Sequence, residues 1–247
     1  MICALCEGET TARPCEHCGA EPYVDDRYEL LAVLGRGANG TTYRARNPAG
    51  GDEVALKELL VRRATSLKTL EMFEREARTL RQLSHPAIPK YLEEFTVDQG
   101  PNVGMYIAQE LVRGHPLAED LNEPMDVLEV LEVVREVGGI LTYLHGLSPP
   151  VIHRDVKPQN LIRSGSTVHL IDFGAVQDAV GVGGDGVPTM AGTVGYMAPE
   201  QLRGTALTAS DVYALGRTAV ALLTGGSPDD KNWAVHVPNL ARALLRT

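Results

Sequence analysis

Alternating apolar and polar residues predict three short β-strands near the start of the chain. The segments run from Tyr28 to Leu34, from Thr41 to Arg46 and from Glu53 to Leu59, and a period of two is typical of strands with one buried face. Residues 47–51, Asn-Pro-Ala-Gly-Gly, predict a turn between the last two. We therefore expect an antiparallel meander.

A helical period follows the third strand. Five apolar residues share one face at about 100° per residue: Met72, Phe73, Ala77, Leu80 and Leu83. Glu76 falls inside this apolar stripe, whereas Glu74 points the opposite way. An inward-facing carboxylate is costly unless it is paired, so we expect Glu76 to bind a cationic side chain.

Composition and charge narrow the class of protein. The 247 residues are 44% hydrophobic, and 23 basic against 32 acidic side chains give a formal charge of −9. This length suits one large or two modest domains with a buried core. The negative charge argues against a nucleic-acid partner, because phosphate binding needs clustered Lys and Arg.

The visible chain shows neither a membrane span nor a secretory signal. The longest apolar stretch, Val212 to Leu223, is interrupted by Arg217 and is shorter than the roughly 18 residues that a span needs. The first nine residues, MICALCEGE, lack the basic region and the long apolar region of a signal peptide. We therefore expect a cytoplasmic protein in a reducing environment.

All four cysteines lie in the first 18 residues, as the pairs Cys3-x2-Cys6 and Cys15-x2-Cys18. Two such pairs are typical of one tetrahedral metal site with four thiolate ligands. Zinc is the first choice and iron the second, because both accept four thiolates; reactive or disulfide-forming pairs are the alternative. Residues 1–22 are thus predicted to be a zinc-ribbon or rubredoxin-like module that needs its metal to fold.

A glycine-rich stretch lies between the first two predicted strands: Gly35-Arg36-Gly37-Ala38-Asn39-Gly40. A dinucleotide-binding fold would need a helix after this GxGxxG pattern, whereas a strand follows it here. A clasp of this kind lets backbone amides close over phosphates; a plain glycine-rich hairpin is the alternative.

Four more motifs follow in order: Val54-Ala55-Leu56-Lys57, His153-Arg154-Asp155-Val156-Lys157-Pro158-Gln159-Asn160, Asp172-Phe173-Gly174 and Ala198-Pro199-Glu200. From about Arg27 to the C-terminus this set resembles a Hanks-type (eukaryotic-like, bacterial style) serine/threonine protein kinase. The resemblance implies an α+β, bilobal protein-kinase fold over residues 27–247. Its parts would be an antiparallel β N-lobe with one helix (27–109), a hinge (110–112) and a mainly helical C-lobe (113–247).

The resemblance implies catalytic roles for five residues: Lys57, Glu76, Asp155, Lys157 and Asn160. Lys57 would hold the α- and β-phosphates of ATP and pair with Glu76. Asp155 would accept or orient the hydroxyl of a protein substrate, and Lys157 would neutralise charge on the transferring phosphoryl group. Asn160 would bind magnesium, or manganese, together with Asp172, a hard oxygen ligand.

The resemblance also outlines the nucleotide site. Gly35, Arg36, Gly37 and Gly40 would close over the phosphates. Thr42 and Ala55 would cover the adenine from above and Ile162 from beneath, with the base bonded by the hinge from Glu110 to Val112. Thr42 stands where the family usually has valine, and Gln109 occupies the gatekeeper position, where Met, Leu or Thr is more usual.

Between Asp172 and Ala198 the sequence predicts a regulatory loop. Residues 178–188 are rich in glycine, which favours mobility. We predict autophosphorylation at Thr189, with a plain exposed threonine as the alternative. Arg154 is the type of cation that pairs with a loop phosphate, and by resemblance Thr193 would instead contact Asp155 and Lys157.

Three further residues have structural roles by resemblance. His153 would pack inside its motif, and Asp211 would cap the backbone of the catalytic loop. Glu200 would pair with an arginine from the end of the family's C-lobe, but Arg27 to Thr247 is shorter than is usual and stops in a predicted helix, Val237 to Leu245. A fragment or a trimmed lobe would leave Glu200 without that partner, at a cost in stability.

Three functions follow. The first is an ATP-dependent serine/threonine kinase, favoured because the catalytic residues are all present. The second is an inactive kinase-fold scaffold, and the third is a metal or thiol sensor that uses the cysteine pairs. Some bacterial-type relatives dimerise through the upper lobe, so a homodimer is a further prediction.

Overall fold

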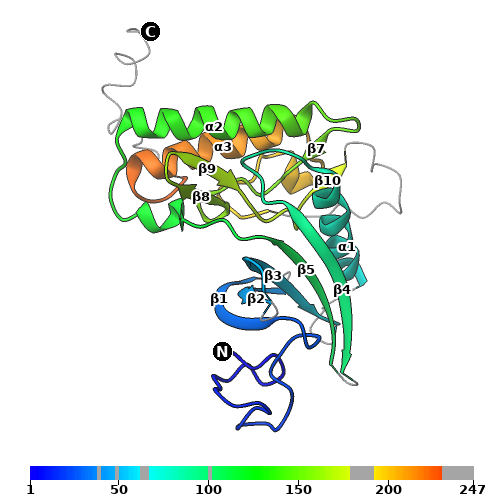
Figure 1. The fold of residues 1–247 in the computed structure, drawn as a ribbon. Coiled ribbons are helices and arrows are strands. Elements are labelled where there is room, and N and C mark those ends of the chain that lie inside the picture. The colour runs from blue at the N-terminus through cyan, green and yellow to red at the C-terminus, as the bar shows by residue number, and fades with distance from the viewer. Residues whose placement is uncertain (38–39, 48–49, 62–66, 100–101, 179–191, 230–247) are drawn as a thin grey trace. The chain divides into compact units, whose positions relative to one another are not determined.

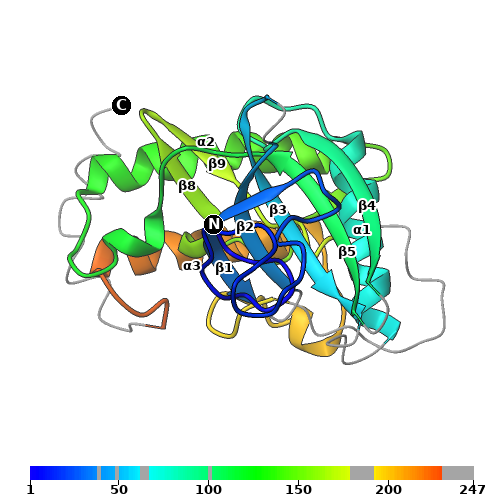
Figure 2. The same ribbon diagram turned by 60° about the horizontal axis from the view of Figure 1, so that its bottom comes forward.

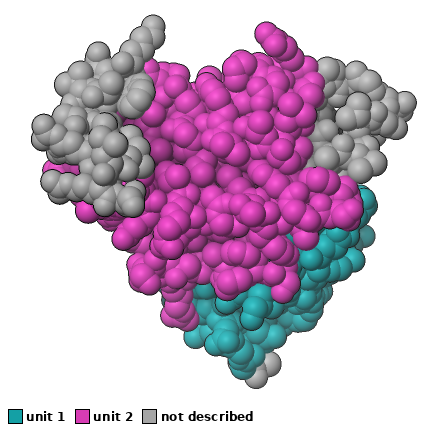
Figure 3. Space-filling view, turned by 90° about the horizontal axis from the view of Figure 1, so that it is seen from above, with its two compact units in different colours: residues 1–83, 89–111 teal, residues 84–88, 112–247 magenta. Residues whose placement is uncertain are grey.

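A computed structural model describes residues 1–37, 40–47, 50–61, 67–99, 102–178 and 192–229. The chain divides into two compact units (Figure 3). Unit 1 comprises residues 1–83 and 89–111, and unit 2 comprises residues 84–88 and 112–247. Unit 1 ends inside the hinge predicted at 110–112, and it includes the cysteine-containing segment.

Unit 1 is built on a five-stranded antiparallel sheet in the order β1-β2-β3-β5-β4 (Figure 1). Its strands are β1 (Glu29–Gly37), β2 (Gly40–Arg46), β3 (Glu53–Leu60), β4 (Tyr91–Gln99) and β5 (Asn102–Glu110). The predicted meander is confirmed. β1 runs three residues further than the alternation indicates, because register shifts after Leu30 and Val33 keep the glycine-rich stretch paired with β2.

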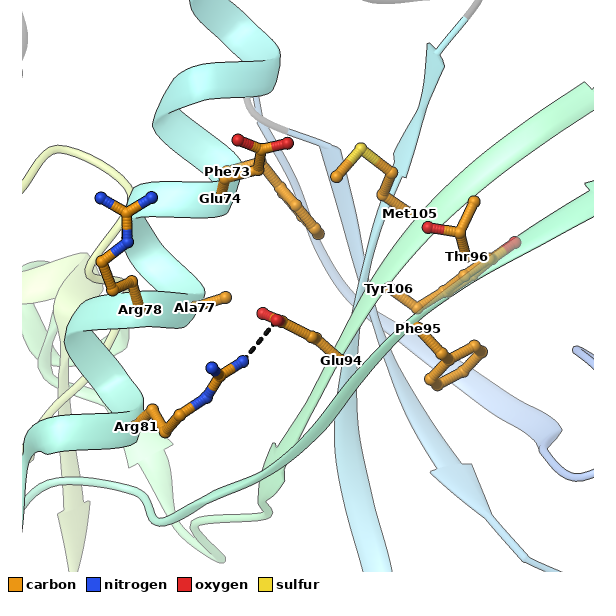
Figure 4. A pocket seen from close by; sticks show the side chains of 10 residues that line it. All are labelled: Phe73, Glu74, Ala77, Arg78, Arg81, Glu94, Phe95, Thr96, Met105 and Tyr106. Atoms are coloured by element: carbon orange, nitrogen blue, oxygen red, sulfur yellow. Dashed lines mark hydrogen bonds and ion pairs between the residues drawn. The ribbon is translucent and has the colours of Figure 1, made fainter.

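Helix α1 (Leu67–Gln82) packs on the sheet through the predicted apolar stripe. Phe73, Ala77 and Leu80 are buried. Between α1 and strands β4 and β5 lies a pocket of about 430 Å³, and an ion pair between Arg81 and Glu94 joins the helix to β4 beside it (Figure 4). The helix is therefore attached to the sheet by apolar and ionic contacts.

The opposite face of the sheet has a second core. Its buried residues include Leu30, Tyr43, Leu56 and Tyr106. Ile2 and Ala4 pack against this cluster, and the Ile2 N–H donates to the Leu30 carbonyl oxygen at 2.7 Å. The N-terminal segment thus lies beside β1 and adds its own side chains to the core (Figures 1 and 2).

Unit 2 is mainly helical. Its long helices α2 (Val127–His145) and α3 (Thr208–Thr224) pack side by side (Figure 1), and each buries apolar residues such as Leu144 and Leu222. Short helical turns are η2 (Leu117–Asp120), η3 (Pro158–Asn160) and η4 (Gln201–Arg203). No helix in the described part of the chain is both long and apolar enough to cross a membrane.

Two small sheets complete unit 2. One has the order β6-β8-β9, from β6 (His115–Pro116), β8 (Leu161–Ser164) and β9 (Thr167–Leu170). The other pairs β7 (Val151–Ile152) with β10 (Gln177–Asp178). These strands frame residues 153–160 and 171–176, and so hold two of the sequence motifs in loops between paired backbone segments.

Candidate active site and metal centre

The predicted ion pair between Lys57 and Glu76 is present in unit 1. Lys57 Nζ lies 2.7 Å from both carboxylate oxygens of Glu76. The Glu76 side chain is 1% exposed and that of Lys57 is 8% exposed, whereas Glu74 lies on the surface. The helical periodicity therefore identifies the correct carboxylate, because only an inward-facing one can reach a lysine in the middle of β3.

The glycine-rich stretch forms the closed end of the β1–β2 hairpin. Gly35 pairs with Thr42, Arg36 with Thr41, and Gly37 with Gly40; residues 38–39 lie outside the described part. Gly40 has φ +123°, and a Cβ there would come within 1.9 Å of the Glu58 carbonyl oxygen. Glycine is therefore required at position 40, both for its backbone conformation and for the close approach of β2 to β3.

The predicted adenine-contacting residues belong to both units. Thr42 is the cross-strand partner of Lys57, and Ala55 is that of Gln109. Glu110 ends β5, and its N–H donates to the Lys90 carbonyl oxygen at 2.9 Å. Val112 and Ile162 are half-buried residues of unit 2, with Ile162 on β8. Their roles in binding the base stay predictions.

In unit 2 the catalytic-loop residues meet around the carboxylate of Asp155. Lys157 Nζ donates to Asp155 Oδ2 at 2.7 Å, and Thr193 Oγ1 donates to Oδ1 at 2.8 Å. Lys157 also donates to Thr193 Oγ1 at 2.5 Å. The predicted contacts of Thr193 are confirmed, and they hold the Asp155 carboxylate in one orientation.

Asn160 completes this cluster. Its Nδ2 donates to the Asp155 carbonyl oxygen at 2.8 Å and to Oδ2 at 3.0 Å. Both partners are acceptors only, so they fix which end of the amide is the NH2 group. The Asn160 carbonyl oxygen Oδ1 therefore faces away from Asp155, as a metal ligand would require.

Asp172 lies two residues after the end of β9, next to a backbone hydrogen bond to Asn160. The Ile171 N–H donates to the backbone carbonyl oxygen of Asn160 at 2.9 Å. Asp172 has φ +61°, which is rare for a residue with a side chain, and its Oδ1 accepts from the Gly174 N–H at 3.3 Å. A carboxylate and an amide oxygen on adjoining backbone segments are a suitable donor set for Mg²⁺.

Asp211 caps the catalytic-loop backbone, as predicted. Its carboxylate accepts from the N–H of His153 at 2.9 Å and from that of Arg154 at 2.7 Å. Arg154 has φ +71°, so this cap holds a strained turn. His153 is fully buried, and its ring packs edge-on against that of Phe173 with 4.8 Å between the ring centroids. This contact confirms its packing role.

Within the described residues Glu200 is hydrogen-bonded, and the predicted loss of its arginine partner stays a prediction, because residues 230–247 lie outside them. The Ser210 hydroxyl donates to Glu200 Oε1 at 2.6 Å, and this bond lowers the pKa of the glutamate. The carboxylate therefore has a hydroxyl donor in the described part of the chain. Sequence reasoning also missed Gln201, a buried amide that donates to the Arg154 carbonyl oxygen and accepts from the Ala198 N–H, both at 3.0 Å.

The four cysteine sulfurs form one cluster, all within 4.8 Å of one another. Cys3 and Cys18 are 3.7 Å apart, and Cys6 and Cys15 are 3.8 Å apart. Thiolates at about 2.3 Å from a tetrahedral zinc lie about 3.8 Å from one another, so the spacing fits that ion. His17, which lies between Cys15 and Cys18 in the sequence, is exposed, and its Nε2 lies 2.7 Å from the Glu9 carbonyl oxygen rather than in the sulfur cluster.

Backbone N–H groups in both cysteine pairs point at the sulfurs. Burial raises the pKa of Cys15, but N–H groups of His17 and Cys18 outweigh it and, with neighbouring thiols, bring that pKa to about 6. Cys3 is more deeply buried, and desolvation raises its pKa to about 12. A cation at the centre of the cluster would favour the thiolate form of all four.

The sequence matches the protein kinase domain family over residues 28–239. This chain belongs to the protein kinase family. The kinase is 36% identical over 234 residues to serine/threonine-protein kinase B of Synechocystis sp. and 31% identical over 218 residues to serine/threonine-protein kinase PrkC of Bacillus subtilis. These alignments each cover 87% of this chain.

A third relative, probable serine/threonine-protein kinase PknB of Lactococcus lactis, is 35% identical over 219 residues, or 86% of this chain. The kinase spans 40%, 33% and 34% of the Synechocystis, Bacillus and Lactococcus proteins. The similarity therefore concerns the kinase domain. Thr189 and the helix predicted from Val237 to Leu245 lie outside the described residues.

Proposed function

We propose that this kinase transfers the γ-phosphoryl group of Mg-ATP to serine and threonine hydroxyls of protein substrates. The observation that carries the proposal is the Asp155 carboxylate held by Lys157, Thr193 and Asn160, with donor–acceptor distances of 2.7 to 3.0 Å. Such fixed positioning is the main contribution that a protein makes to phosphoryl transfer.

Each catalytic side chain has a separate task in this proposal. Asp155 orients the substrate hydroxyl and accepts its proton as the oxygen bonds to phosphorus. Lys157 places a positive charge beside the phosphoryl group, and Lys57, oriented by Glu76, binds the α- and β-phosphates. Asn160 Oδ1 and Asp172 would hold magnesium, which neutralises phosphate charge when bound.

Transfer of labelled phosphate from ATP tests the proposal. The wild-type chain should label a generic protein substrate or itself, while Asp155→Asn and Lys57→Met variants should not. Equal background labelling in all three proteins would instead support the inactive scaffold. Folding of each variant is checked by its thermal transition, because Lys57 is part of a buried ion pair.

Autophosphorylation at Thr189 is the finer part of the proposal. A glycine-rich segment precedes this threonine, and the charge of Arg154 suits a loop phosphate. Phosphopeptide mapping after incubation with Mg-ATP should find the modified threonine. An unmodified segment in an active enzyme would exclude it.

The cysteine cluster is proposed to hold one structural zinc ion. The sulfur spacing supports zinc, although iron accepts the same four thiolates. Metal analysis of the purified protein separates the two ions. A kinase rate that changes on oxidation of the cysteines would favour the thiol-sensor alternative, whereas an unchanged rate would leave them a structural role.

A further inference from the structure

The two cysteine pairs have the same backbone geometry. In the first, the Glu7 N–H donates to the Cys3 carbonyl oxygen and the Cys3 N–H to the Gly8 carbonyl oxygen, both at 2.9 Å. In the second, Gly19 and Ala20 make the equivalent bonds with Cys15, both at 2.8 Å. We call these turns the first and second knuckle. Glu7 and Gly19 therefore occupy equivalent positions.

The equivalent position favours glycine. Glu7 has φ +59° and Gly19 has φ +72°, a left-handed conformation that is strained for a residue with a Cβ. The second knuckle has the residue that avoids this strain, and the first does not. Since the metal site needs no side chain at this position, the presence of glutamate calls for another reason.

The carboxylate of Glu7 makes an ion pair outside the knuckle. Its Oε2 lies 2.9 Å from Nη1 of Arg36, the residue between Gly35 and Gly37 at the closed end of the β1–β2 hairpin. The Glu7 side chain is 23% exposed and that of Arg36 is 52% exposed. The knuckle therefore reaches the part of the hairpin that is proposed to close over ATP phosphates.

A second contact joins the start of β1 to the N-terminal cysteine-containing segment. The Ile2 N–H donates to the Leu30 carbonyl oxygen at 2.7 Å, next to the first register shift in β1. The cysteine-containing segment thus holds β1 both near its start and at its glycine-rich end. A hairpin end flanked by glycines has high conformational entropy in the free protein. A contact that restrains the hairpin end therefore lowers the entropy that ATP binding has to remove.

We propose that Glu7 is a positioning residue that couples the metal-held first knuckle to the nucleotide-binding hairpin. The metal fixes the knuckle, the knuckle directs the Glu7 carboxylate at Arg36, and the ion pair restrains the hairpin for ATP. Metal loading then increases the affinity for ATP without any metal contact to the nucleotide. This inference rests on the proposed kinase function.

The effect on ATP binding is modest, because the ion pair is partly exposed. Pairs of this kind change an equilibrium by about two- to fivefold. Removal of the Glu7 carboxylate should therefore raise KM for ATP by about that factor and leave kcat nearly unchanged, since Asp155 and its partners lie elsewhere in the chain.

The Glu7→Gly variant separates positioning from folding. It copies the second knuckle, so it relieves backbone strain and should keep or raise the midpoint of thermal unfolding, while KM for ATP and the Kd of a fluorescent ATP analogue rise together. The double variant Glu7→Gly, Arg36→Gln should bind ATP no more weakly than the weaker-binding single variant. Chelation of the metal should weaken ATP binding by the wild type more than by Glu7→Gly.

Glu29→Gln is the matched control. Glu29 pairs with Arg46 at 2.7 Å across the open end of the same hairpin, so its loss removes an equal charge far from the glycines and should leave KM for ATP unchanged. An unchanged or lower KM for ATP in Glu7→Gly would overturn the coupling but not the kinase function. So would an equal loss of ATP binding by the wild type and Glu7→Gly on chelation. A wild type that binds no nucleotide would overturn the proposed function as well.

Discussion

Lys57 donates to both carboxylate oxygens of Glu76 at 2.7 Å, in a position where both side chains are buried. A buried ion pair contributes little net stability compared with apolar residues, but it is costly to break from one side. Its value to this kinase is therefore the fixed position of the lysine ammonium.

Glu76→Gln tests that position. The amide keeps the shape of the glutamate but leaves the Lys57 charge uncompensated by Glu76, so kcat/KM should fall by about 100-fold and the free energy of unfolding by about 1–3 kcal/mol. Steady-state kinetics and urea unfolding measure the two effects. The control is Glu74→Gln, two residues away on the exposed face of α1, which should behave as wild type.

Thr193→Val should reduce kcat with little change in KM for ATP. The hydroxyl bonds both Asp155 and Lys157, and valine has the same shape without it. Loss of a hydrogen bond to a charged group, worth about 1.5 kcal/mol, corresponds to about a tenfold slower reaction. Thr193→Ser should restore most of the rate; a serine variant as slow as the valine variant would count against this role.

Asp211→Asn should weaken both folding and catalysis. The carboxylate is fully buried and accepts from two backbone N–H groups of the catalytic loop, so an amide cannot replace both oxygens as acceptors. We expect a loss of about 2–4 kcal/mol in unfolding free energy and a large fall in kcat. Asp126→Ala removes an exposed carboxylate that caps the start of α2, and it should cost about 1 kcal/mol without changing kcat.

Removal of the metal should release the N-terminal segment from the sheet. One zinc ion per chain is expected in wild type, less than one in Cys15→Ser, and one in His17→Ala, because the His17 ring lies outside the sulfur cluster. Loss of the packing of Ile2 and Ala4 on the second core should lower unfolding free energy by about 1–3 kcal/mol. Zinc bound as tightly by Cys15→Ser as by wild type would contradict the four-thiolate site.

Stability should fall as the pH drops below about 6.5, the ordinary pKa of histidine. Burial lowers the pKa of His153, and its Nε2 has no hydrogen-bond partner among the described residues. The unfolded chain therefore takes up a proton in this range while the folded chain does not, which favours unfolding. Urea midpoints from pH 7.5 to 5.5 should fall less steeply for His153→Phe than for wild type, even though this variant starts from lower stability.

Patterns with a short repeat made the sequence informative about local structure. The apolar stripe of α1 identifies Glu76, and strand alternation locates the meander. Both patterns repeat within four residues, so they can be recognised without knowing how distant segments pack. Contacts between residues far apart in the sequence depend on loop geometry, and no short repeat predicts them. The Ser210 hydroxyl donates to Glu200, and the Glu7–Arg36 pair joins residues whose approach depends on how the first knuckle packs.

Asp211 lies 58 residues after His153 in the sequence, yet it supplies the acceptor for that residue's N–H. During synthesis on the ribosome, a chain that ends before α3 already contains the complete motif from His153 to Asn160. Its loop would lack the carboxylate that satisfies two backbone donors and holds Arg154 in its left-handed conformation. Phosphoryl-transfer competence should thus arise only after α3 has emerged from the ribosome and docked.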